Sequence, residues 1–186
     1  MLILALEPYY GGSHQAFLDG WISHSIHDWT VLSLPAHKWK WRMRHAAITF
    51  AEDVRQHVAN GESWDAVFAS DMLNLAEFQG LAPRAVAELP AVAYFHENQL
   101  TYPNQDPRER DLHFAFTNLT TALAADQVWF NSAFHRDSFL DALREYLPRM
   151  PDYQPLDAID EIQRKAIVHP PGSKTLHRGP RRVTSR

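Results

Sequence analysis

The stretch Leu2–His14, LILALEPYYGGSH, joins a run of apolar residues to a glycine pair and a polar pair. The apolar run has the length and composition of a strand that is buried on both faces. We expect Leu2–Leu6 to form that strand, Glu7–Ser13 to form a loop, and a helix to begin at His14. Because a strand, a glycine-containing loop and a helix in this order open a βαβ unit, the stretch predicts a parallel α/β fold.

The same alternation continues along the whole chain. Short apolar runs are separated by segments whose apolar residues recur with helical spacing. The predicted strands are Leu2–Leu6, Thr30–Leu34, Ala66–Ala69, Ala91–Phe95, Gln127–Phe130 and Ala166–Val168. The predicted helices are His14–His27, Met43–Ala59, Asn74–Ala87 with an interruption near Pro83, Glu109–Ala124, Ser132–Tyr146, and a short one after the Pro-rich segment Pro148–Pro155. This order predicts the α/β class, with a Rossmann-like parallel sheet flanked by helices.

Two of the longer predicted helices have a clear apolar face. In Met43–Ala59 the apolar residues with helical spacing are Ala47, Phe50, Ala51, Val54 and Val58. In Glu109–Ala124 they are Leu112, Phe116, Leu119 and Leu123. We expect both faces to pack on the sheet.

Composition limits the class of protein further. The chain has 186 residues, 45% of them apolar, which suits one globular domain with a sizeable core. It has no cysteine, which excludes a disulfide framework and thiolate-bound zinc, and we expect no metal site. No apolar run approaches the roughly 18 residues of a membrane span. The first residues lack the basic region of a signal peptide, so we expect a cytoplasmic protein without membrane contact.

Charge is distributed unevenly along the chain. The net charge is −4, but residues 173–186 contain five basic and no acidic side chains. The preceding part is therefore clearly acidic, which is not typical of a general nucleic-acid binder. We expect residues 1–172 to form one domain and residues 173–186 to form a disordered basic tail, because the tail has too few apolar residues to offset its ordering entropy.

Unusual polar sequences follow the first, second, fourth and fifth predicted strands. In parallel sheets, ligands bind beyond the carboxyl ends of the strands. All four polar clusters fall on this edge, which structural motifs alone would not require. The sequence therefore predicts a ligand site there.

The first cluster contains Gly11, Gly12, Ser13 and His14. Paired glycines let the backbone turn tightly and approach a ligand, and Ser13 is expected to cap the helix that follows. A helix N-terminus also favours an anion or a polarised hydroxyl. An ordinary glycine turn with a cap explains the pattern equally well, and the dinucleotide and P-loop fingerprints are absent.

The second cluster lies in the predicted loop Ala36–Arg42. Here cationic and indole side chains alternate, in Lys38, Trp39, Trp41 and Arg42. This arrangement suits phosphate contact and stacking on a base or sugar. The alternative is the start of a surface helix, in which the indoles pack inward and the cations are merely solvated. We favour binding, because exposed tryptophans in a loop usually mark a partner.

The third cluster contains His96, Glu97, Asn98 and Gln99. His96 could bind a hydroxyl or act as an acid or base, and Glu97 could orient it or accept from a hydroxyl. Leu100 stands where H-E-x-x-H would need its second histidine, so a zinc-protease site is excluded. The weaker alternative is a loop whose polar residues only satisfy backbone groups.

The fourth cluster is the pair Asn131 and Ser132. Either side chain can cap the helix that follows the fifth strand. Simple capping and ligand contact are equally compatible with this pair.

Together, EPYYGGSH (7–14), LPAHKWKWR (34–42), YFHENQLTYP (94–103) and FNSAFH (130–135) resemble the tRNA-queuosine α-mannosyltransferase family. The resemblance runs in order from Leu2 to about Gly172. It implies the N-terminal half of a GT-B glycosyltransferase fold. It also implies transfer of mannose from GDP-mannose, with retention, to queuosine at a tRNA wobble position, without a further cofactor.

The resemblance also implies roles for individual residues. The catalytic residues would be His96 and Glu97, nearest the transferred sugar. The residues that would bind substrate are Gly11, Gly12, Ser13, His14, Lys38, Trp39, Trp41, Arg42, Asn98, Gln99, Asn131 and Ser132.

A full-length relative would continue from Val168–Gly172 into a domain that binds the nucleotide sugar. The basic tail stands there instead, so we expect this chain to be truncated and inactive alone. The alternative is a non-catalytic remnant that binds tRNA or another nucleic acid. A small α/β hydrolase that uses His14 or His96 is weaker, because the G-x-S-x-G elbow is absent.

Overall fold

The structure is a computed structural model that describes residues 1–103 and 112–172. The expected basic tail, residues 173–186, lies outside the described residues. So do the first residues of the helix predicted over 109–124.

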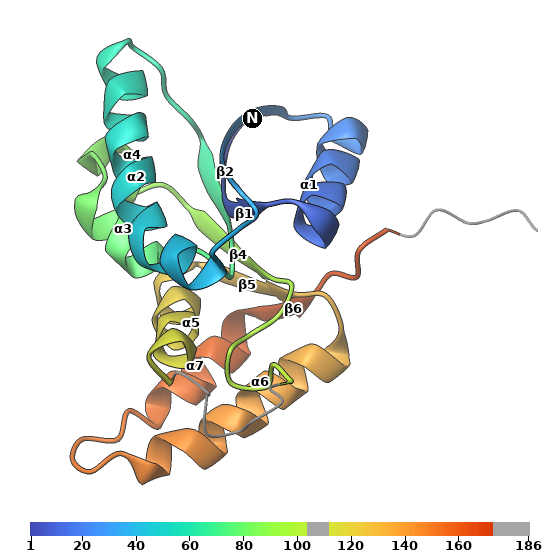
Figure 1. Ribbon diagram of the computed structural model, residues 1–186, viewed down its shortest axis with the longest axis vertical. Coiled ribbons are helices and arrows are strands. Elements are labelled where there is room, and N and C mark those ends of the chain that lie inside the picture. Colours follow the sequence, from blue (N-terminus) through green and yellow to red (C-terminus); the bar gives the residue numbers. More distant parts are fainter. Residues whose placement is uncertain (104–111, 173–186) are drawn as a thin grey trace, which may run out of the picture.

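Six parallel strands form one sheet within the described residues (Figure 1). Their order across the sheet is β2-β1-β3-β4-β5-β6. The strands are β1 (Leu2–Tyr10), β2 (Asp28–Pro35), β3 (Ala66–Ser70), β4 (Ala91–Phe95), β5 (Gln127–Phe130) and β6 (Ala166–Val168). In register, Leu4 of β1 lies opposite Thr30 of β2 and Val67 of β3. The predicted α/β class with a Rossmann-like parallel sheet is confirmed.

Helices connect the successive strands. They are α1 (Gly12–His24), α2 (Trp39–Ala59), α3 (Leu75–Leu81), α4 (Arg84–Ala87), α5 (Leu112–Ala124), α6 (Ala133–Tyr146) and α7 (Asp157–Lys165). The interruption predicted near Pro83 separates α3 from α4. Ser132 caps α6 by accepting a hydrogen bond from the N–H of His135. α2 ends at Ala59 and is followed by its C-cap Asn60 and by Gly61, which takes a φ of 88° that favours glycine.

The order of the strands decides which face each helix covers. The chain moves from β1 to β2 in one direction across the sheet, and from β2 through β3 to β6 in the other. Because such crossovers are right-handed, helices of the two directions lie on opposite faces. Figure 1 shows α1 on the opposite side of the sheet from α2 and α3.

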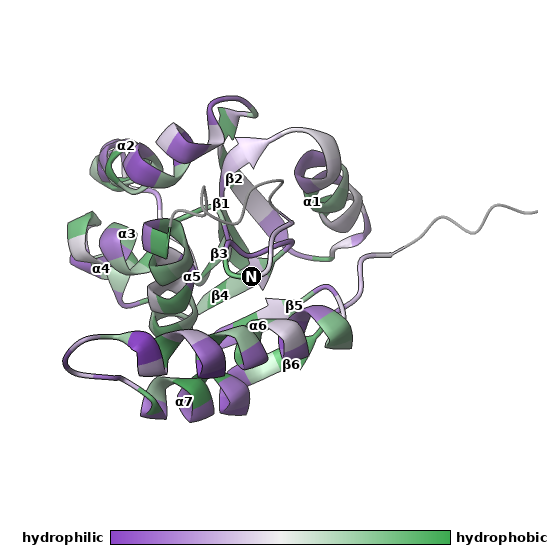
Figure 2. Cartoon of the chain, turned by 60° about the horizontal axis from the view of Figure 1, so that its bottom comes forward, coloured by the Kyte–Doolittle hydropathy of each residue, from purple (hydrophilic) through white to green (hydrophobic). Residues whose placement is uncertain are grey.

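Most of the core lies on the α2 face. Leu4 and Leu6 point to that face and Ala5 to the other, as expected when side chains alternate along a strand. Phe50 of α2 and Phe139 of α6 are fully buried in the same cluster. Figure 2 shows apolar residues concentrated on the strands and on the inward sides of the helices. The α1 face is filled instead by aromatic side chains that include Phe68, Tyr94, Trp21 and Trp129.

Two predicted loops are wrong at the carboxyl edge of the sheet. β1 continues to Tyr10 instead of ending at Leu6, because β2 pairs with it along that length. α1 then starts at Gly12 with Gly11 as its N-cap, so Ser13 is not the cap. The predicted loop Ala36–Arg42 is also wrong in its second half, since α2 begins at Trp39.

The apolar face predicted for α5 is correct only in part, since Leu119 is buried in the core and Leu123 packs against it. Leu112 and Phe116 are exposed, whereas the polar residues Thr117, Asn118 and Thr121 are buried. The reason lies in their hydrogen bonds to neighbouring backbone. Asn118 accepts from Gln99 N and donates to Asp71 O, and the Thr121 hydroxyl donates to Leu73 O and accepts from Leu75 N. Buried polar groups with partners are stable, and apolar periodicity alone does not reveal them.

Asn118 is expected to be important for stability. Asn118→Ala should lower the free energy of unfolding by about 2–4 kcal/mol, because two buried backbone groups lose their partner. This change in the free energy of unfolding is measured by urea denaturation, with circular dichroism as the signal. The control is Thr120→Ala on the same helix, where the hydroxyl only bonds back to Thr117 O. Equal effects of the two substitutions would contradict a structural role for the Asn118 amide.

Candidate functional site

The strand order places the topological switch point of the sheet between the carboxyl ends of β1 and β3. The chain leaves these adjacent strands toward opposite faces of the sheet, so the connections after them diverge. In open α/β sheets, ligands bind at this switch point. The predicted clusters after β1 and β4 flank it.

A compact group of polar residues, which we call the rim cluster, occupies this edge. It consists of Glu7, His14, Ser70, Asp71 and His96. The first four are buried and His96 is half-buried. Sequence reasoning missed Ser70 and Asp71, although both follow the apolar run of the third strand. Their position at the carboxyl end of a buried strand was the signal that could have identified Ser70 and Asp71 as site residues.

Glu7 and His14 form a buried ion pair within the rim cluster. Glu7 Oε2 lies 3.3 Å from His14 Nδ1. Glu7 Oε1 accepts from Tyr9 N at 2.9 Å and from the Ser70 hydroxyl at 3.0 Å. Burial opposes the charged imidazole, but the hydrogen bond and charge of Glu7 outweigh it and raise the pKa of His14 to about 9. His14 is therefore an imidazolium at neutral pH.

The stability of the fold should depend on this proton. The pKa of His14 is raised from 6.5 to about 9, so its contribution is complete below pH 6.5 and disappears as the pH rises through 9. A change of this size corresponds to about 3 kcal/mol. The free energy of unfolding, measured in urea at pH 6.5 and 9.5, should fall by this amount more in the wild type than in His14→Gln. Identical pH dependence in both proteins would contradict a charged His14.

His96 lies directly against His14 but stays neutral. The two ring centroids are 4.1 Å apart. Burial, together with the charge of His14, lowers the pKa of His96 to about 3. Its main chain is held from two sides: His96 N donates to Asp71 Oδ1 at 2.9 Å, and Asn131 Nδ2 donates to His96 O at 2.8 Å. The site thus combines a fixed neutral imidazole with an adjacent cation.

Two further carboxyl groups complete the electrostatics of the site. Burial raises the pKa of Asp71 to about 7, and its Oδ2 has no hydrogen-bond partner among the described residues. Burial also raises the pKa of Glu97, while the charge of His14 acts in the opposite direction. Both groups hold protons more readily than ordinary carboxylates, so the site can exchange protons near neutral pH.

The glycine pair leaves the start of α1 open to a ligand. A Cβ at Gly11 would lie 2.5 Å from the Cβ of Ala36, and Gly12 takes a φ of 56°. Among the described residues no side chain caps α1, and Gly12 and Ser13 are exposed. The first N–H groups of the helix are therefore available to an anion or hydroxyl next to His14.

The remaining predicted residues of the third and fourth clusters shape the loops around His96. Asn98 is buried, with Nδ2 2.8 Å from both Thr101 Oγ1 and His135 Nε2. Gln99 donates its N–H to Asn118. Asn131 holds His96, and Ser132 caps α6. The geometry explains the side chains of Asn98, Asn131 and Ser132 by contacts within the protein, and Gln99 by a contact of its main chain.

The second cluster divides into buried and exposed members. Trp39 packs against Phe114, with ring centroids 5.2 Å apart. Arg42 is buried: its Nε donates to Pro35 O at 3.1 Å, and its other nitrogens lie beside His37 and His45. This placement differs from the expectation that Trp39 and Arg42 face an acceptor, because both turn inward at the first turn of α2.

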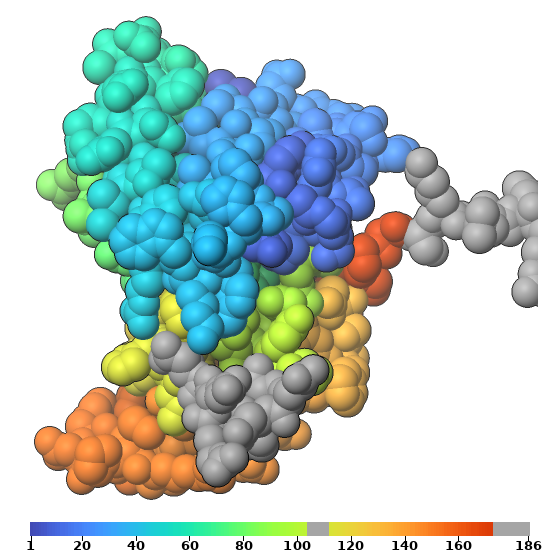
Figure 3. All heavy atoms as spheres, in the orientation of Figure 1, coloured from blue at the N-terminus to red at the C-terminus, as the bar shows by residue number. Residues whose placement is uncertain are grey.

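The exposed members form a continuous basic and aromatic surface, which we call the α2 patch. It consists of Lys38, Lys40, Trp41 and Arg44, and the Trp41 side chain is 63% exposed. In Figure 3 the start of α2 (light blue) lies at the surface beside the dark-blue N-terminal part of the chain. Such a surface can contact phosphates and stack on a base.

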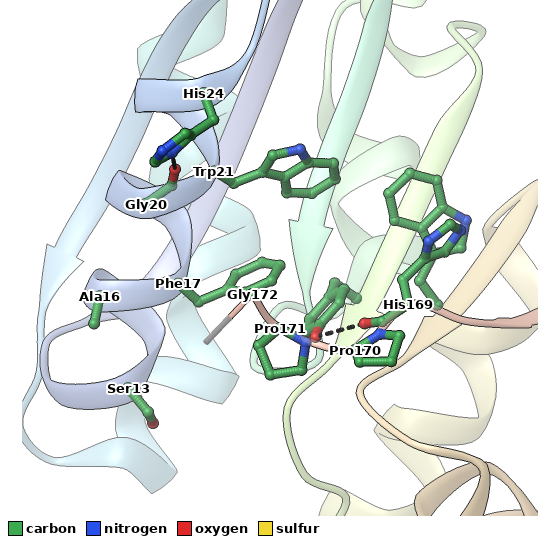
Figure 4. A pocket seen from close by; sticks show the side chains of 12 residues that line it. Ser13, Ala16, Phe17, Gly20, Trp21, His24, His169, Pro170, Pro171 and Gly172 are labelled. Atoms are coloured by element: carbon green, nitrogen blue, oxygen red, sulfur yellow. Dashed lines mark hydrogen bonds between the residues drawn. The ribbon is translucent and has the colours of Figure 1, made fainter. Parts of the chain in front are cut away.

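An apolar groove of about 900 Å³ adjoins the rim cluster on the α1 face of the sheet. Figure 4 shows it between α1, which contributes Phe17 and Trp21, and the segment after β6. The Tyr94 hydroxyl donates to His169 O at 3.1 Å across its floor. Phe17 stacks on Tyr94 and makes a T-shaped contact with His96, with ring centroids 4.9 Å apart. The groove therefore leads to the rim cluster.

Glu7, His14 and His96 also have donor atoms within 4.8 Å of one another, which is close enough to consider a metal ion. His14 directs Nδ1 to Glu7, however, and its ring lies against that of His96. We therefore describe the group as an ion pair beside a neutral imidazole. In residues 1–103 and 112–172, no helix has the length and apolar character to cross a membrane.

Comparison with known proteins identifies the family of this chain. The family model described as tRNA-queuosine alpha-mannosyltransferase N-terminal matches residues 2–172. The tRNA-queuosine alpha-mannosyltransferase of Drosophila melanogaster is 40% identical over 167 residues, which are 89% of this chain and 43% of the fly protein. This chain thus spans less than half the length of that relative. From residue 2 to residue 172, the chain belongs to the tRNA-queuosine alpha-mannosyltransferase family.

Proposed function

We propose that this chain supplies the acceptor side of a glycosyltransferase that moves mannose from GDP-mannose to queuosine in tRNA. Family membership supports the reaction class. The observation that carries the assignment to the acceptor is the position of the α2 patch near the rim cluster. In this proposal the α2 patch binds nucleic acid and the rim cluster binds hydroxyl groups. Both lie at the carboxyl edge of one sheet. A tRNA acceptor supports the expected cytoplasmic location.

The rim cluster suits the chemistry of glycosyl transfer. In this reaction the bond from the sugar C1 to the diphosphate breaks, a bond from C1 to an acceptor oxygen forms, and the acceptor hydroxyl loses its proton. A neutral His96 can donate a hydrogen bond to a hydroxyl or accept one from it. His14 and the open start of α1 stabilise negative charge that develops on the leaving group. We assign to Glu97, the residue after His96, the role of orienting His96 or accepting from a hydroxyl.

The α2 patch explains how an acidic domain binds an anionic acceptor. Lys38, Lys40 and Arg44 concentrate positive charge at one place, and Trp41 offers an exposed ring between them. Sequence-specific recognition of RNA favours unpaired bases that stack on aromatic side chains. A wobble nucleoside lies in a loop, where its neighbours can be unstacked in this way.

The donor, GDP-mannose, is expected to bind mainly to a second domain. In GT-B enzymes, which this chain resembles, the N-terminal domain mainly holds the acceptor and the C-terminal domain mainly holds the nucleotide sugar. The fly relative has more than half of its length beyond the aligned residues. Its unaligned part is the natural candidate for that second domain.

The test is incorporation of labelled mannose from GDP-mannose into queuosine tRNA. The chain is assayed alone and mixed with the part of the fly relative that lies beyond the aligned residues. We expect incorporation only in the mixture, and incorporation by the chain alone would contradict the proposed division of labour. Binding of queuosine tRNA without incorporation in either assay would favour the alternative function, a non-catalytic tRNA-binding protein.

A further inference from the structure

The burial of Asp71 is not explained by the fold alone. Its side chain is 0% exposed, Oδ1 accepts from His96 N, and Oδ2 has no partner among the described residues. Asp65 and Asp126 make the same type of bond at the opposite edge of the sheet, to Leu2 N and Ala91 N, and both are exposed. A carboxylate that only holds a strand end can therefore stay in water. Burying one is costly and implies a further role.

Asp71 belongs to a ring of charged groups around His14. Glu7 reaches His14 from β1, Asp71 acts on it from the end of β3, and Glu97 from the segment after β4. The ring of His96 lies 4.1 Å away, and His135 of α6 is close enough to contribute to the low pKa of His96. Several carboxyl groups thus surround one imidazolium and its neutral neighbour.

Two imidazoles this close are not both protonated: only one ring takes up an extra proton, because a second positive charge would be repelled. Nearby negative charge decides which ring keeps it. His14 has the hydrogen bond to Glu7 and the charge of Asp71. Asp71 contacts His96 only through the main-chain N–H, so it restrains this residue without drawing the proton to its ring.

We propose that Asp71 is a positioning residue for the two histidines: it fixes the main chain of His96, and its charge adds to that of Glu7 in keeping the positive charge on His14 and not on His96. Its significance for sugar transfer rests on the proposed function, in which a neutral His96 meets a hydroxyl and a charged His14 meets the leaving group. The pKa of Asp71, raised to about 7, supports this coupling between Asp71 and His14. The charge of a carboxyl group that titrates close to His14 changes the pKa of that histidine.

The test is an NMR titration of the histidine side chains, labelled with ¹³C at Cε1, in the full chain. Asp71→Asn keeps an oxygen for His96 N but removes the charge. We expect the pKa of His14 to fall by about one pH unit or more, as removal of a nearby charge predicts. Asp126→Asn removes a charge from a matched strand-end carboxylate and should leave both histidines unchanged.

An unchanged His14 pKa in a folded Asp71→Asn variant would overturn the proposal. If that variant does not fold, the wild type provides a second measurement: the His14 resonance should shift at the pH at which the carboxyl carbon of Asp71 titrates. A His14 resonance that does not respond there would equally overturn it. The titration reads protonation and not transfer, so failure of the proposed function would appear separately, as absent tRNA binding or mannose incorporation.

Discussion

Glu7→Ala is expected to lower the free energy of unfolding by about 3–5 kcal/mol, the usual cost of removing one partner from a buried ion pair. Glu7 accepts hydrogen bonds from Tyr9 N and the Ser70 hydroxyl and faces the charged ring of His14. The substitution leaves these donors and a buried positive charge without their acceptor. Since a domain is typically stable by only about 5–15 kcal/mol, the loss is large.

The chain contains a matched control for this experiment. Glu62 pairs with His57 at 2.7 Å, but both side chains are partly exposed to water. Glu62→Ala should therefore cost at most about 1 kcal/mol. Both variants are compared by urea unfolding at pH 7. If both substitutions lower the free energy of unfolding by the same amount, the buried Glu7–His14 pair does not stabilise the rim cluster in the way that we expect.

Trp41→Ala is expected to weaken the binding of queuosine tRNA by about 1–3 kcal/mol, the value of one base stacked on an aromatic ring. This corresponds to roughly 5- to 150-fold in the dissociation constant. The side chain is 63% exposed and contributes little to the core, so the loss should appear in binding and not in stability. Fluorescence anisotropy of labelled tRNA at fixed salt measures it.

Two controls distinguish stacking from a general effect of the substitution. Trp41→Phe keeps an aromatic face and should retain most of the affinity. Ile48→Ala removes another exposed apolar side chain, 48% exposed, from the same helix and should have no effect. Affinity unchanged in Trp41→Ala, or lost equally in Ile48→Ala, would show that the α2 patch does not bind tRNA by stacking.

Much of the fold follows from the sequence because the strands are apolar throughout. β4, β5 and β6 were predicted with their observed bounds, since each apolar run is flanked by polar or turn-forming residues. α5 shows where this approach fails. Its buried face contains Asn118 and Thr121, whose partners are backbone groups 19 to 48 residues distant in the chain. Apolar periodicity cannot register such contacts.

The site was predictable in part. His14 and His96 follow strands and stand in polar clusters, and the structure brings their rings together. Asp71 was missed because its role depends on β3 lying beside β1, which is a property of strand order and not of spacing along the chain. Arg42 and Trp39 were placed in a loop. Helical geometry, which turns successive side chains by about 100°, instead puts them inside and Trp41 outside.

The central claim is that this chain holds queuosine tRNA as an acceptor. The most direct test compares its affinity for one tRNA that carries queuosine with its affinity for the same tRNA that carries guanosine at that position. Because the rim cluster offers hydrogen bonds to the diol of queuosine, we expect tighter binding of the modified tRNA by about tenfold, the value of one or two hydrogen bonds. Equal affinity for both tRNAs would contradict the account.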